Sequence, residues 1–161
     1  MHELLLVLLG FFIGCIPPWF ARKRRLKTHW CALRAEMEQC KDKAETLLRD
    51  NVQAPLYRLP LICYQVSFPI LLSDGALEEQ DAFTLGRFYS QVQDINRGLD
   101  NAAEMYKAGD LVKVNVEYRR NCLKATALFQ SEGETPALYP AAKKIVDAKI
   151  LLPWYKYSKM A

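Results

Sequence analysis

Residues 26–47, LKTHWCALRAEMEQCKDKAETL, hold the pattern that decides the fold. Apolar and small side chains recur there at alternating intervals of four and three residues, which places them on one face of a helix. Oppositely charged residues lie four apart on its other faces, as Lys41 and Glu45 do, and favour the same helix. The repeating positions are Leu26, Trp30, Leu33, Met37, Cys40, Ala44 and Leu47.

Two structures fit this repeat. In one, two chains pair through it as a parallel coiled-coil stalk, and in the other a single amphipathic helix packs onto its own domain. Cys40 and Ala44 are poor residues for a coiled-coil seam, and about three heptads make a short stalk. We therefore favour the single packed helix and keep the stalk as the alternative.

The segment before this helix has the properties of a membrane anchor. From Leu4 to Ala21 the chain carries no charge, and as a helix this run spans roughly 27 Å, close to the hydrocarbon thickness of a bilayer. Trp19 and Phe20 end the run, where interfacial aromatic residues are expected. We predict a transmembrane anchor over residues 1–30 and a helical cytoplasmic domain over residues 31–161. A basic cluster closes the anchor and comprises Arg22, Lys23, Arg24, Arg25 and Lys27.

The order of the charges indicates a retained anchor and its orientation. A cleaved signal peptide carries positive charge before its apolar run, whereas here the cations follow the run. Lipidation at Cys15 is an alternative, but the apolar run continues past that cysteine. Cations stay on the cytoplasmic side, so we expect a single-pass protein of the bacterial inner membrane with its N-terminus outside. The lipid bilayer is then a partner, and the cluster attracts anionic headgroups.

Two glycines inside the run, Gly10 and Gly14, lie one helical turn apart. This spacing lets two helices approach closely in lipid, so it predicts a homodimer through the anchor. It also supports an alternative function, a membrane-active oligomer of the holin or toxin kind.

The body of the chain predicts an all-α fold, with about four further helices in a small bundle. Apolar periodicity and turn residues place them near residues 60–72, 77–107, 111–130 and 140–152. The stretch from Leu59 to Leu72 has no charge, and we expect a central buried helix kinked at Pro69, with a membrane- or partner-facing segment as the alternative. Asn96 falls on the apolar stripe of the helix expected near residues 77–107. We expect it to be a hydrogen-bonded core residue rather than a functional site. Gly109 is the expected cap that ends it.

The charge balance and the missing motifs exclude several functions. Five of the 22 basic residues lie in the cluster, while one of the 18 acidic residues, Glu3, lies before it, so the remaining domain is neutral and does not suit nucleic acid. The histidines, His2 and His29, precede residue 30, and no glycine-rich phosphate loop or Cys-x-x-Cys pair occurs. Carboxylate pairs such as Glu36 and Glu38 are expected to be solvated. We predict no enzyme activity, no cofactor and no metal.

The adjacent arginines Arg119 and Arg120 allow two interpretations. They are suited to binding an acidic group, although such pairs more commonly form a solvated helix edge.

Three short stretches carry a resemblance of layout: Ala32-Leu-Arg-Ala-Glu-Met-Glu38, Leu71-Leu-Ser-Asp-Gly-Ala-Leu77 and Arg87-Phe-Tyr89. With the anchor and its basic stop, they make the chain similar to uncharacterised bacterial single-pass membrane proteins that have a small helical cytoplasmic domain. The resemblance implies an all-helical fold and transfers no activity. We expect a non-catalytic protein that tethers, scaffolds or regulates a protein partner at the cytoplasmic face.

Overall fold

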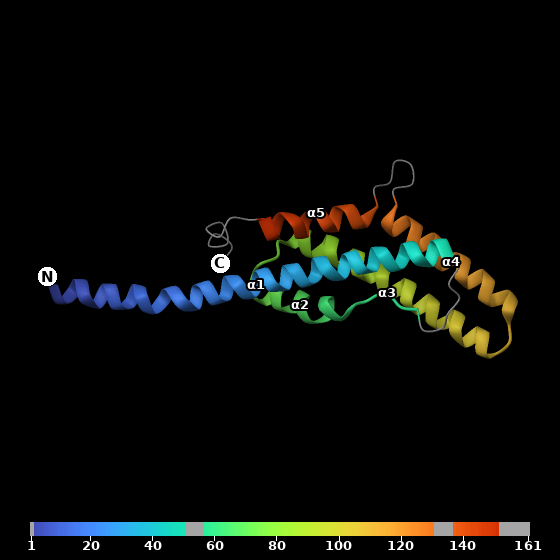
Figure 1. Cartoon of the computed structure of the whole chain (residues 1–161), viewed down its shortest axis with the longest axis horizontal. Helices are drawn as coiled ribbons and strands as arrows, with labels where there is room; N and C mark the ends of the chain where they lie inside the picture. The colour runs from blue at the N-terminus through green and yellow to red at the C-terminus, as the bar shows by residue number, and fades with distance from the viewer. Residues whose placement is uncertain (1, 51–56, 131–136, 152–161) are drawn as a thin grey trace.

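The computed structural model describes residues 2–50, 57–130 and 137–151, without the side chains of residues 2–9, 11–17 and 50. This part of the chain is all-α, as predicted, with four helices after the first (Figure 1). The five helices are α1 (His2–Asp50), α2 (Ile62–Ser73), α3 (Glu79–Lys107), α4 (Leu111–Phe129) and α5 (Leu138–Leu151).

Helix α1 runs unbroken through the predicted boundary after residue 30. Its N-terminal part extends away from the other helices, and its C-terminal part lies among them (Figure 1). All seven positions of the repeat are at most 5% exposed, and Trp30 and Leu33 are fully buried. The chain's own helices cover this face, so the prediction of a single packed helix is confirmed and the face is not open for a coiled-coil stalk.

Helices α3 and α4 form a long hairpin whose turn contains Gly109 at φ 79°, the left-handed conformation that ends a helix. The tip of the hairpin projects past the end of α1 (Figure 1). The apolar periodicity that predicts these two helices places Tyr106 and Leu111 on their buried stripes, but the two side chains are 55% and 59% exposed. The predicted helical periodicity is confirmed, but the predicted burial of these two side chains is wrong, because no other helix extends far enough to cover the tip of the hairpin.

The position of helix α2 differs from the central buried position that we expected. It packs on α1 at the edge of the bundle, with Ser67 and Leu71 on its buried side. Its opposite side exposes Ile62, Val66 and Leu72 at 75%, 56% and 47%. The stretch 59–72 is therefore not a central buried helix. It lacks charge on both sides although solvent reaches one of them.

Helix α5 closes the bundle through polar contacts with α1. The carboxylate of Glu38 accepts hydrogen bonds from Lys143 and from the Tyr139 hydroxyl, 2.5 and 2.7 Å away. One helical turn earlier on α1, Arg34 pairs with Asp147 at 3.0 Å. The earlier residue on α1 contacts the later residue on α5, so the two helices are antiparallel. Helix α5 therefore ends on the side where α1 leaves the bundle (Figure 1).

Candidate functional site

The basic cluster lies where α1 leaves the bundle, and two of its members bind the turn after α2. The Arg25 guanidinium lies 2.6 Å from the Asp74 carboxylate, and Arg22 donates to the Asp74 backbone carbonyl at 2.8 Å. Asp74 follows the last residue of α2 and precedes Gly75, which takes a φ of 65° in this turn. The turn thus holds α2 against the cationic part of α1.

The remaining cations of the cluster face outward. Lys23 lies over the ring of Trp19, with its ammonium 3.3 Å from the ring centroid. Trp19 in turn contacts Phe20 edge to face, and Arg24 and Lys27 are exposed. An aromatic pair beside outward cations has the composition of a membrane-interface belt. Two of the five cations, Arg22 and Arg25, are thus engaged by Asp74 within the chain.

The predicted anchor and dimer face belong to the N-terminal part of α1. Within the described part of the chain, no helix combines the length and apolar character needed to cross a membrane. Most of the expected anchor, including Gly14, falls on residues 2–9 and 11–17, whose side chains lie outside the described part. Gly10 is exposed, and a Cβ built on it has nothing within 4 Å.

A buried carboxylate was missed by the sequence analysis. Glu36 is 2% exposed, and it accepts hydrogen bonds from the backbone amides of Cys63 and Tyr64 at 2.6 and 2.8 Å. Both amides belong to the first turn of α2, whose N-cap residue Leu61 provides no side-chain cap. The expectation that the Glu36/Glu38 pair is solvated is therefore wrong for Glu36. The missing cap residue before α2 was the one sequence signal that this helix needs an acceptor from elsewhere.

Around Glu36, burial keeps neighbouring groups neutral. Burial, with a smaller effect from the charge of Glu36, raises the pKa of the Cys40 thiol to about 12. The same two causes raise the pKa of the Tyr89 hydroxyl. Tyr89 stacks on Tyr64 with ring centroids 4.0 Å apart, and Cys40 donates to the Pro60 carbonyl. Neutral thiols and phenols are poor nucleophiles, so this cluster has the chemistry of a packed core.

The structure places His29 inside the folded domain, where we had expected no histidine. Its Nδ1 lies 3.1 Å from the hydroxyl oxygen of Ser67 on α2. A Ser–His pair is the centre of many hydrolases, but it needs a serine that substrate can reach. Ser67 is only 2% exposed, so this pair is a bond between two helices.

Asn96 is a hydrogen-bonded core residue, as predicted. Its amide oxygen accepts from the Leu59 backbone nitrogen at 2.8 Å, and its amide nitrogen donates to the Leu59 carbonyl at 2.9 Å. The described residues contain no group of three or more metal-ligating side chains. Cys31, Cys40, Cys63 and Cys122 are all free thiols.

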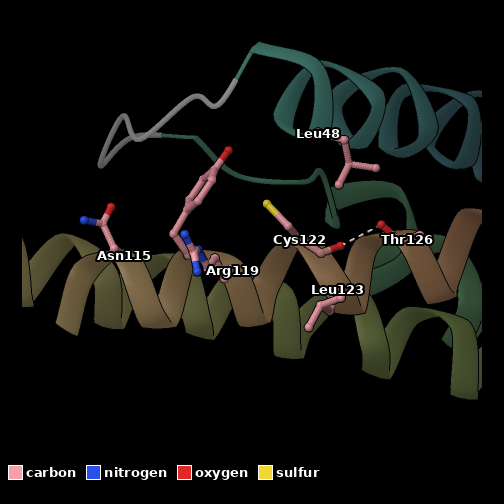
Figure 2. Close-up of a pocket in the computed structure, with 7 residues that line it drawn as sticks. Leu48, Asn115, Arg119, Cys122, Leu123 and Thr126 are labelled. Atoms are coloured by element: carbon pink, nitrogen blue, oxygen red, sulfur yellow. Dashed lines mark hydrogen bonds between the residues drawn. The ribbon is translucent and has the colours of Figure 1, made fainter. Parts of the chain in front are cut away.

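A hollow of about 640 Å³ lies on α4 beside the last turn of α1. Figure 2 shows Leu48 entering it from α1, while the other lining side chains come from α4. The Tyr118 hydroxyl donates to the Leu47 carbonyl at 2.8 Å and ties the two helices together there. The lining residues are Leu48, Asn115, Tyr118, Arg119, Cys122, Leu123 and Thr126.

Comparison with known proteins gave no match to any family model, to any curated protein or to any solved structure. The fold and site define the class of the molecule, an antiparallel helical bundle built on one long N-terminal helix. The resemblance of layout to single-pass bacterial membrane proteins stays a prediction.

Proposed function

We propose that this protein is a single-pass membrane protein whose helical bundle tethers, scaffolds or regulates a protein partner at the cytoplasmic face, without catalysis. One observation carries the proposal: the apolar run at residues 4–21 and the buried seam at residues 26–47 belong to the same unbroken helix. A bundle built on such a helix is joined to its anchor without a flexible linker.

The contact of Asp74 with Arg22 and Arg25 supports the same arrangement. It fixes the end of α2 at the point where α1 would leave the bilayer. Because a helix rises about 1.5 Å per residue, the end of α1 at Asp50 would then stand roughly 40 Å above the basic cluster. The bundle is suited to holding a partner at a set distance from the membrane.

Two apolar surfaces support partner binding over catalysis. Ile62, Val66 and Leu72 are exposed on α2, and Val112, Val116 and Leu123 are exposed on α4. Exposed apolar rows of this kind are typical of contact sites for other macromolecules. The polar pairs found inside the bundle join its helices to one another.

Crosslinking in native membranes, followed by mass spectrometry, tests the proposal. We expect a reproducible heterologous partner that is retained when residues 1–21 are exchanged for an unrelated transmembrane helix. Self-crosslinks alone, lost in Gly14→Ile, would instead support the membrane-active oligomer.

Orientation has its own test, because Cys31 is exposed just beyond the cluster. We expect a membrane-impermeant maleimide to label it only after the inner membrane is opened, with Cys31→Ser as the control. Labelling in intact spheroplasts would overturn the proposed orientation.

A further inference from the structure

Helix α4 has two apolar faces, and the bundle uses only one. Val114, Tyr118 and Ala125 lie on the inner face and are buried. On the opposite face, Val112 is 75% exposed and Leu123 is 68% exposed. The exposed row consists of Val112, Val116, Leu123 and Ala127, spaced four, seven and four residues apart along one side of the helix.

One cation lies within this row and another lies beside it. Arg119 lies between Val116 and Leu123 along the helix, and Lys124 lies beside its far end. Arg119 and Lys124 form no ion pair with any residue that the structure describes. Arg120, in contrast, pairs locally with Glu117 at 3.5 Å. Two cations are therefore available to an incoming acidic group.

The row also has a hollow on each side. Arg119 and Leu123 line the hollow of about 640 Å³ beside α1, shown in Figure 2. Lys124 and Ala127 line a smaller one of about 170 Å³ against α3, together with Gln91 and Asp94. The row is thus a ridge, and both hollows give room for side chains of a molecule laid along it.

We propose that this face of α4 binds an acidic amphipathic helix of a partner protein. Apolar side chains of that helix, spaced three and four residues apart, would pack on Val116 and Leu123. Its flanking carboxylates would pair with Arg119 and Lys124. This inference rests on the proposed function, to which it adds the place and the chemistry of partner recognition.

Charge and position favour this occupant over two others. A second copy bringing the same face would set cation against cation. The hydroxyl of Tyr118 on α4 binds the carbonyl of Leu47, and in an upright α1 Leu47 stands roughly 40 Å from the end of the apolar run at Ala21. The row therefore lies well away from the lipid surface of the same membrane.

The test uses the full chain in nanodiscs of zwitterionic phosphatidylcholine. The probe is a fluorescent peptide of about 18 residues, long enough to form a helix, with leucine on one face and glutamate on both flanks. A matched peptide carries lysine at every glutamate position. Fluorescence anisotropy measures the Kd of each peptide.

We expect the acidic peptide to bind, the lysine peptide to fail, and the affinity to fall with added salt. Arg119→Glu combined with Lys124→Glu should weaken binding by about tenfold or more, and Leu123→Ser should weaken it at unchanged charge. Val66→Ser, an exposed apolar position on α2, is the matched control and should leave Kd unchanged.

Three results would overturn the inference: no binding of the acidic peptide, equal binding of both peptides, or an unchanged Kd in the charge-reversed variant. Displacement of the peptide by phosphatidylserine vesicles would also overturn it, by assigning the face to lipid. Crosslinking distinguishes a failure of this inference from a failure of the proposed function. If crosslinking captures a partner and the charge-reversed variant still captures it, the tether stands and this docking face falls.

Discussion

The backbone amide of Tyr64, in the first turn of α2, donates a hydrogen bond of 2.8 Å to the carboxylate of Glu36 on α1. The cap that a helix ordinarily takes from its own N-terminal residue is supplied here by a neighbouring helix. A carboxylate also suits the positive end of the α2 dipole. The first turn of α2 therefore has this cap only while it is docked on α1.

Replacing Glu36 tests this dependence. Glu36→Ala leaves two amides of α2 without their acceptor, and we expect a loss of about 3 kcal/mol in the free energy of unfolding, measured by urea denaturation in mild detergent. Glu36→Gln keeps one acceptor oxygen and should lose clearly less. Equal losses in the two variants would show that shape, not hydrogen bonding, matters at this position.

Gly98 on α3 faces the side chain of Asn121 on α4. A Cβ at this position would clash with the side-chain amide of Asn121, which is fully buried. We expect Gly98→Ala to destabilise the bundle by about 1–3 kcal/mol, because the buried amide has little room to move. Thermal unfolding followed by circular dichroism measures this loss.

Asn121 provides the matching rescue. Its amide has no hydrogen-bond partner among the described residues, so it is desolvated without compensation. Asn121→Ala should therefore cost little for a buried position, and the double variant with Gly98→Ala should be more stable than the sum of the two single losses predicts. Additive losses would mean that the clash is not with this side chain.

Glu38 should make stability depend on acid. Its hydrogen bond from Lys143, and then that from the Tyr139 hydroxyl, hold the pKa of the Glu38 carboxyl below its ordinary value of 4.5. A depressed pKa in the folded state adds stability above the unfolded value, and this stability is lost as the pH falls through the folded value. We expect Glu38→Gln to lower Tm at neutral pH and to flatten its decline between about pH 5 and pH 3.

The control for Glu38 is Glu45→Gln, because Glu45 is exposed and pairs locally with Lys41, four residues away. Its acid dependence should match that of the unmodified protein. A Glu38→Gln profile parallel to the unmodified one would contradict the prediction.

The cysteines of α1 should differ in reactivity. Cys31 is exposed, whereas Cys40 is fully buried and has a pKa raised to about 12. Thiolate is the reactive form, so we expect N-ethylmaleimide to modify Cys31 within minutes at pH 7.5, while Cys40 reacts only in urea. Peptide mass spectrometry identifies the sites. Rapid labelling of Cys40 in the native protein would mean that the α1–α2 contact opens readily.

Much of the architecture follows from periodicity alone. The four- and three-residue intervals in residues 26–47 predict the buried face of α1 because a helix returns to the same side at that spacing. The bounds of α3, α4 and α5 lie within two residues of those expected from their turn residues. Asn96 was also recognised as a core residue, because a lone polar group in an apolar stripe must be hydrogen-bonded.

Other features depended on which helices become neighbours. Glu36 and His29 carry no local mark of burial, since their partners, Tyr64 and Ser67, lie on another helix. The exposed row of α4 was also hidden, because valines on both faces look alike in a sequence.

The sequence by itself determined that the chain is helical, that residues 26–47 form one buried seam, and that the positive charge lies in one cluster. Local spacing and charge are properties of the chain, so no partner helix is needed to see them. Only the tertiary structure decided that α2 lies at the edge with one apolar side bare, that Asp74 binds Arg22 and Arg25, and that Glu36 caps α2. The reason is that an uncharged helix such as 62–73 can be buried on either side, and the docking of α2 on α1 selects the side.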